Sequence, residues 1–293
     1  MSCNGECFSG ALMADYRPQG NIETIHGRET YVARPPNGSN PKGIVIIIPD
    51  AFGLPFPNNK NLADRYAKDG NFLVYLPDFM DGRSAPVWML NVFPQVMSTA
   101  TIWDWIVKPY YIAQAMYGMV PFLYFNSFGN SMPKIVSFFE AVRDNEATSQ
   151  NLPIGCAGFC WGGLFTFHLA SGQYTSAKSG KVLCDAHFTA HASNVKVPDD
   201  AKKVTLPLSV AQATEDMVMT LEQARQVEAI LREKAEKQGL KHSEVVYYEG
   251  ANHGFGVRAD QVWGNEKTKE HADGSIKQAI DFYNRVFQDW TAQ

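Results

Sequence analysis

The chain has 293 residues, of which 45% are hydrophobic and 19% charged, a composition that supports a large core and excludes a disordered or fibrous protein. Its formal net charge is -4 and its 26 lysines and arginines are scattered, which argues against nucleic acid as a partner. The 5 cysteines are odd in number and lack framework spacing, so we expect a reduced, intracellular protein.

The N-terminal sequence lacks a basic region followed by an apolar stretch, so it does not predict a signal peptide. Residues 109–133 carry no charge, which raises the question of a membrane span. Pro109, Pro121 and Asn126 interrupt that run and argue against a transmembrane helix. The sequence therefore predicts a cytoplasmic location.

Strand and helix signals alternate along the chain, which is the pattern of a parallel sheet wrapped by helices. A continuous run of β-branched residues at 43–49 predicts a strand that is buried on both faces. The other expected elements are, in chain order, a helix at 58–69, a strand at 72–76, a helix at 133–144, a strand at 154–158, a helix after Gly162, strands at 185–190 and 206–213, a helix at 221–235, a strand at 244–248 and a helix at 276–290. Together they predict a single α/β domain over 1–293.

One segment, 87–130, breaks this alternation. Between Val87 and Phe128 only Asp104 and Lys108 are charged, whereas the 41 residues at 88–128 include 11 aromatic ones. The segment is too long for an ordinary connection and too apolar for a linker. We interpret it as an insertion in the domain.

The aromatic residues of this insertion cannot all face water without forming a large apolar patch. They must cover the active-site mouth, a second copy of the chain in a homodimer, or a membrane surface. We favour a lid, in which Trp103 and Trp105 provide flat apolar walls for an aromatic substrate.

Gly158-Phe159-Cys160-Trp161-Gly162-Gly163 lies where a predicted buried strand turns into a helix. This is the spacing of a nucleophile elbow, with Cys160 in place of the usual serine. The flanking residues must be small because the tight turn brings the backbone close to its neighbours. The N-terminus of the following helix favours a thiolate. The alternative is a buried structural cysteine, but the strand–turn–helix context favours a nucleophile.

A base and an acid follow in the chain order of α/β-hydrolases. His253 comes shortly after the last predicted strand, with glycine on its far side, and it is the candidate base. Glu215 and Asp216 follow the preceding strand, and we favour Asp216 as the acid that orients the imidazole of His253.

These motifs together resemble the dienelactone hydrolase (carboxymethylenebutenolidase) family. The resemblance extends from about Thr30 to Trp290, apart from the insertion, and depends on Pro49-Asp50-Ala51-Phe52-Gly53, Pro77-Asp78-Phe79, Gly158-Phe159-Cys160-Trp161-Gly162-Gly163, Glu215-Asp216 and His253-Gly254-Phe255. It implies an α/β-hydrolase fold, with a mostly parallel sheet of about eight strands and helices on both faces.

The resemblance also implies roles for further residues. Asp50 would help to ionise the thiol of Cys160, and the backbone N–H groups of Ala51 and Trp161 would form the oxyanion hole. Arg83 and Arg258 are the candidates for binding a substrate carboxylate.

The activity implied is hydrolysis of a small-molecule lactone or ester through a cysteinyl thioester, with no cofactor. Two alternatives stay open. The same chemistry could release a product from a thioester in a biosynthetic pathway, or the chain could be a non-catalytic binding protein that keeps the fold.

The remaining cysteines and histidines have structural interpretations. Cys184, His187 and His191 have spacing that could hold a metal, but no fourth ligand is evident. We therefore expect no metal site, and structural or pocket-lining histidines instead. Cys3 and Cys7 lie in a polar stretch and are expected to be free thiols.

Overall fold

The computed structural model of the chain describes residues 16–97, 101–258 and 266–291. The expectation for Cys3 and Cys7 concerns residues outside these ranges. Within them, no helix combines the length and the apolar character that crossing a membrane requires.

An eight-stranded sheet forms the centre of the molecule, with the order β1-β2-β4-β3-β5-β6-β7-β8. The strands are β1 (Asn21–Ile25), β2 (Arg28–Ala33), β3 (Ile44–Ile48), β4 (Leu73–Pro77), β5 (Ile154–Phe159), β6 (Ala186–Ala190), β7 (Leu208–Ala213) and β8 (Glu244–Tyr248). Strands β3 to β8 are parallel, and β1 and β2 add an antiparallel edge. The predicted mostly parallel sheet is confirmed.

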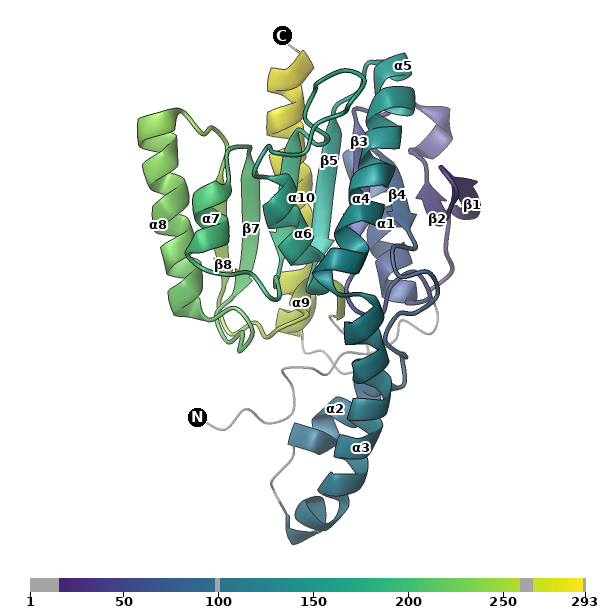
Figure 1. The fold of residues 1–293 in the computed structure, drawn as a ribbon, viewed down its shortest axis with the longest axis vertical. Helices are drawn as coiled ribbons and strands as arrows, with labels where there is room; N and C mark the ends of the chain where they lie inside the picture. Colours follow the sequence, from purple (N-terminus) through teal and green to yellow (C-terminus); the bar gives the residue numbers. More distant parts are fainter. Residues whose placement is uncertain (1–15, 98–100, 259–265, 292–293) are drawn as a thin grey trace.

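Helices cover both faces of this sheet. In Figure 1, α4 and α6 lie in front of the sheet, and α1 and α10 lie behind it. The helices are α1 (Pro57–Gly70), α2 (Met89–Met97), α3 (Ile102–Phe125), α4 (Phe128–Val142), α5 (Thr148–Gln150), α6 (Trp161–Leu169), α7 (Asp199–Lys203), α8 (Leu221–Gln238), α9 (Phe255–Arg258) and α10 (Glu266–Thr291). The described residues also include a 3₁₀ turn at Pro36–Gly38 and a π-helical turn at Arg143–Ala147.

The core includes close packing between β5 and α10. Every residue of β3, the predicted double-sided strand, is fully buried. On the neighbouring β5, Gly155 leaves room for the ring of Tyr283, which would lie 2.7 Å from a Cβ at that position. The hydroxyl of Tyr283 donates a hydrogen bond to the carbonyl of Cys156 (2.7 Å). This packing fixes the strand that leads to Cys160.

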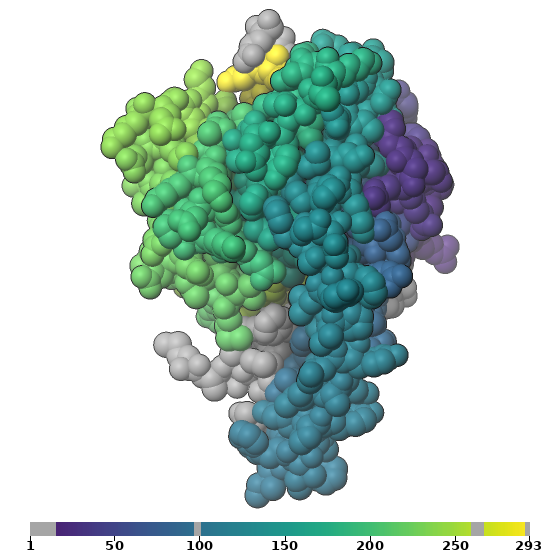
Figure 2. Space-filling view, in the orientation of Figure 1, coloured from purple at the N-terminus to yellow at the C-terminus, as the bar shows by residue number. Residues whose placement is uncertain are grey.

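The sequence did not predict the short helices α5, α7 and α9 or the first ten residues of α10, and it did not predict two larger parts of the structure. One is the pair of strands β1 and β2. Strand β1 is a largely exposed edge strand with polar residues and so lacks an apolar pattern, whereas β2 has four buried residues and was missed despite them. The insertion contains the helices α2 and α3, which the sequence analysis did not assign. They form an arm that projects beyond the rest of the molecule, at the lower end of Figures 1 and 2.

Candidate active site

Cys160 occupies a sharp turn between β5 and α6, with a positive φ of 50°. That conformation is rare for a residue other than glycine and needs support from its surroundings. The flanking glycines provide it: a Cβ at Gly158 would lie 2.0 Å from Thr166 Oγ1, and one at Gly162 would lie 2.1 Å from the carbonyl oxygen of Ile48. The predicted elbow is therefore present, and its glycines are required by close packing.

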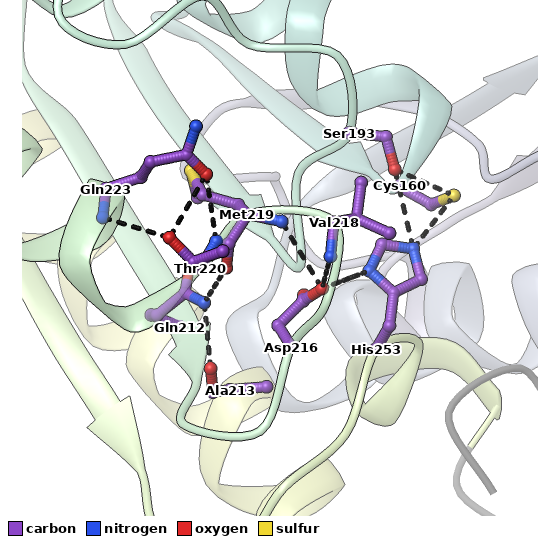
Figure 3. A network of polar contacts seen from close by, with 10 residues as sticks. All are labelled: Cys160, Ser193, Gln212, Ala213, Asp216, Val218, Met219, Thr220, Gln223 and His253. Carbon is purple, nitrogen blue, oxygen red and sulfur yellow. Dashed lines mark hydrogen bonds and ion pairs between the residues drawn. The ribbon is translucent and has the colours of Figure 1, made fainter. Parts of the chain in front are cut away.

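The imidazole of His253 lies between the cysteine and an aspartate (Figure 3). Its Nε2 is 3.2 Å from the Cys160 sulfur, and its Nδ1 is 2.9 and 3.0 Å from the two carboxylate oxygens of Asp216. The three residues follow β5, β8 and β7, whose carboxyl ends meet at one edge of the parallel sheet. The structure thus brings together the nucleophile, base and acid expected from the sequence.

The carboxylate of Asp216 is fixed by its own loop. The backbone N–H groups of Val218 and Met219 donate to its Oδ1 (2.8 and 3.4 Å). Gln212, on β7, donates to the carbonyl of Met219 (2.8 Å) and so ties the loop to the sheet. Glu215, the other candidate acid, is exposed. The structure therefore selects Asp216 as the partner of His253.

The electrostatics of the site favour an ion pair between Cys160 and His253. Burial opposes ionisation of the thiol, but the charge of His253, its hydrogen bond and the charge of Arg258 outweigh it and lower the pKa of Cys160 to about 7. Burial also opposes protonation of His253, yet the Cys160 thiolate and the hydrogen bond that Nδ1 donates to Asp216 raise its pKa to about 9. A thiolate beside an imidazolium is the form between these two values.

Asp50 does not contact the cysteine sulfur through any of its described hydrogen bonds. Its fully buried carboxylate accepts from Arg258 Nε (3.0 Å), from Asn59 Nδ2 (3.1 Å) and from the backbone N–H of Phe52 (3.2 Å). In this arrangement its negative charge raises the pKa of Cys160. Asp50 is therefore the counter-ion of Arg258, and its expected role in ionising the thiol stays a prediction.

Of the two arginines expected to bind substrate, only Arg258 lies beside Asp50 and Cys160. It is buried, and its charge helps to stabilise the Cys160 thiolate. Arg83 lies at the base of the arm, where its guanidinium stacks 3.9 Å from the centre of the Phe125 ring and its carbonyl accepts from Asn126.

Trp103 and Trp105 lie at the far end of the arm and are 67% and 61% exposed. Nearer the other end of α3, Phe122 contacts the ring of Trp161, the residue that follows Cys160. Since an α-helix rises 1.5 Å per residue, Trp103 is about 28 Å further along the helix axis than Phe122. The structure does not bring these two tryptophans to Cys160.

The backbone amides of Ala51 and Trp161 lie after neighbouring strands. Ile48 pairs with Gly158 in the parallel register of β3 and β5, and the two amides are each three residues beyond that pair. Trp161 is the first residue of α6, so its N–H has no acceptor within the helix. This placement fits the expected oxyanion hole.

Two residues after β6 lie beside Cys160 and were not predicted from the sequence. Ser193 Oγ lies 3.4 Å from the Cys160 sulfur and 3.4 Å from His253 Nε2, and its backbone N–H donates to the carbonyl of Cys160 (2.9 Å). The buried ring of His191 packs edge-on against His253, with the centroids 5.1 Å apart. Their position just after a predicted strand next to β5 was the signal that could have found them.

Two of the three residues whose spacing could hold a metal make hydrogen bonds to backbone carbonyls instead. Cys184 donates to the carbonyls of Ile154 and Ala186 (3.3 and 3.1 Å), and His187 Nδ1 lies 3.1 Å from the carbonyl of Pro207. Among the described residues, no group of three or more His, Cys, Asp or Glu side chains could hold a metal.

The sheet order and the three strand-end residues are those of an α/β-hydrolase. A family model, the dienelactone hydrolase family, matches residues 29–287, so the chain belongs to that family and is a hydrolase of ester or lactone bonds.

Individual relatives agree with this assignment. The chain is 26% identical over 286 residues to the hydrolase tropI of Talaromyces stipitatus, covering 97% of this chain and 96% of that protein. It is 24% identical to the carboxymethylenebutenolidase homolog of Rattus norvegicus, covering 92% and 93%. A putative dienelactone hydrolase from Klebsiella pneumoniae superposes with a TM-score of 0.60 at 16% identity, covering 91% and 97%, which shows the shared fold.

Proposed function

We propose that the protein hydrolyses a lactone or ester through a covalent thioester on Cys160. The observation that carries this proposal is the hydrogen-bonded chain from Asp216 through His253 to the sulfur, at distances of 2.9 and 3.2 Å. It supports a thiolate nucleophile with a proton already on the neighbouring imidazole. No cofactor takes part in this scheme.

In the first half-reaction the Cys160 thiolate attacks the carbonyl carbon. The negative charge that forms on the carbonyl oxygen is stabilised by the amides of Ala51 and Trp161. As the C–O bond breaks, His253 Nε2 gives its proton to the leaving oxygen. With a lactone, the new alcohol or enol stays attached to the acyl group, which is now a thioester of Cys160.

In the second half-reaction, neutral His253 removes a proton from a water molecule that attacks the thioester. The intermediate expels the Cys160 thiolate and leaves the free acid, and the proton on His253 restores the ion pair. Asp216 holds the imidazole by Nδ1 throughout, so that Nε2 faces the reacting atoms in both steps.

Trapping the covalent intermediate tests this proposal. The protein would be mixed with lactones, aryl esters and acyl thioesters, quenched in acid and analysed by intact-mass and peptide mass spectrometry. A lactone should add its whole mass to Cys160, and an ester only its acyl group. Turnover retained in Cys160→Ser and Cys160→Ala, or an adduct on Ser193, would contradict a cysteinyl mechanism. The substrate type with the highest kcat/KM would also separate lactone hydrolysis from thioester release.

A further inference from the structure

The outer face of α3 is apolar although it faces solvent. Its largest exposed side chains are Ile102, Trp103, Ile106, Tyr110, Tyr117 and Tyr124, each between 62% and 82% exposed. The buried residues of α3 are instead Gly118 and Phe122, and Gly118 packs against Met89 of α2. This distribution is the reverse of that in an ordinary surface helix, whose outer face is polar.

The polar residues of α3 do not offset this apolar face. Its two charged residues are already engaged: Asp104 accepts from the backbone N–H of Thr101 (2.8 Å) at the N-cap, and the Lys108 ammonium lies 4.6 Å from the centre of the Trp105 ring. The outer face is therefore apolar along its length and nearly free of charge.

The size of the face matches that of a protein–protein interface. Four of the six residues are aromatic, with roughly 150–250 Å² each, and together with the two isoleucines they expose on the order of 800 Å². The largest apolar patch on a typical monomer covers about 300–600 Å², whereas a stable interface buries about 800 Å² on each partner. The outer face of α3 thus exceeds the first value and reaches the second.

We propose that the arm is a dimerisation surface, on which the outer face of α3 packs against the same face of a second copy. Such a two-fold interface requires a surface that is compatible with itself, and an almost uncharged apolar face meets this condition. A hollow of about 440 Å³, lined by Trp88, Tyr110, Ala113, Gln114 and Tyr117, lies on the arm and can receive a partner side chain.

A membrane surface fits this face less well than a second copy. Helices that lie on membranes have a strongly polar opposite face, commonly rich in lysine and arginine, which helps them to bind anionic lipid. The helix α3 has no such stripe, because Lys108 is its single basic residue. The net charge of the chain, -4, would also oppose approach to anionic lipid.

Sedimentation velocity over a wide range of protein concentration tests the proposal. We expect a dimer that dissociates on dilution, and the variant Tyr117→Glu should weaken association at least about tenfold, as the loss of an interface hot spot does. The matched control is Ile22→Glu, because Ile22 is 48% exposed on the edge strand β1, away from the arm. It should dimerise like the unmodified protein.

Two outcomes would overturn the dimer. One is a monomer at every concentration, and the other is dimerisation unchanged by both Tyr117→Glu and a second outer-face variant, Ile106→Glu. Flotation of the monomer with phosphatidylcholine vesicles would identify a lipid surface instead. Circular dichroism of each variant establishes that the fold is intact, which is expected because both substituted side chains point into solvent.

Discussion

The catalytic cluster and the arm lie at the same end of the molecule but are built in opposite ways. In the cluster, Cys160, His253 and Asp216 come from three strand ends and are joined by short polar contacts. In the arm, large apolar side chains lie on one helix and are mostly exposed. Chemistry requires fixed directions, which hydrogen bonds provide, whereas association requires apolar area. Substitutions in the cluster should therefore change the reaction without changing association, and those in the arm should do the reverse.

The largest effect is expected for Cys160→Ala. Removing the nucleophile should lower kcat/KM by ~10³-fold or more, as it does in triad enzymes. Since Cys160 is not among the residues of the outer face of α3, the sedimentation of the variant should not change. Full activity in Cys160→Ala would exclude the cysteinyl mechanism. A change in association would show that the catalytic cluster and the arm are not independent of each other.

Asp50→Asn should mainly affect stability. It leaves the buried guanidinium of Arg258 without its counter-ion, a change that costs about 3–5 kcal/mol when a buried pair is broken. The exposed carboxylate Glu215, changed to Gln, is the control.

The same Asp50→Asn variant tests the direction of the electrostatic effect on the cysteine. Loss of the negative charge should lower the pKa of Cys160 further, and this can be followed by the pH dependence of thiol alkylation. A higher pKa in the variant would mean that Asp50 assists ionisation, as the family resemblance implied.

The unmodified protein should be alkylated at Cys160 even in mildly acidic solution. The thiolate fraction rises with pH through the pKa of about 7. At pH 6 it is about one tenth, compared with well under one hundredth for an ordinary cysteine. Peptide mapping after brief iodoacetamide treatment should find Cys160 modified before the buried Cys156 and Cys184. His253→Gln should shift the profile to higher pH, and an unchanged profile would show that His253 does not stabilise the thiolate.

Ser193→Ala should have a smaller effect, because its hydroxyl is one of several groups around the sulfur. The hydroxyl can donate to the thiolate across 3.4 Å, and a hydrogen bond of this kind contributes about 1 kcal/mol, or roughly a fivefold change in kcat/KM. Ser193→Thr keeps the hydroxyl and should recover most of the loss. If Thr and Ala are equally impaired, the space around Ser193 matters and its hydroxyl does not.

The sequence was sufficient to predict the strand-end residues of the cluster. A buried strand, a glycine-flanked Cys160 and a histidine after the last strand are local patterns, and the rules of parallel sheets bring them to one edge. The ion pair of Asp50 with Arg258 could not be derived in this way, because 208 residues separate the partners and no local pattern relates them.

The arm shows a different limit of sequence analysis. A helix is recognised by an apolar stripe beside a polar one, and α3 has apolar residues on both its covered and its outer sides. Its composition therefore predicted that the segment must cover another surface. It did not predict that the segment forms a helix, or which side of that helix is exposed to solvent.

The smallest effect on catalysis is expected for the double variant Trp103→Ala/Trp105→Ala. A lid would lose about 1–3 kcal/mol of binding to a bulky aryl lactone for each lost contact, with little change for a small lactone. Because both tryptophans lie far along α3 from the Phe122–Trp161 contact, we expect instead that kcat/KM changes less than about twofold for both substrates. Steady-state kinetics on the two lactones measures kcat/KM, and sedimentation of the same sample measures association. Weaker association with unchanged kinetics would assign the tryptophans to the dimer surface. A selective loss on the bulky lactone would show that the arm closes over the site, and that the cluster and the arm act together on the substrate.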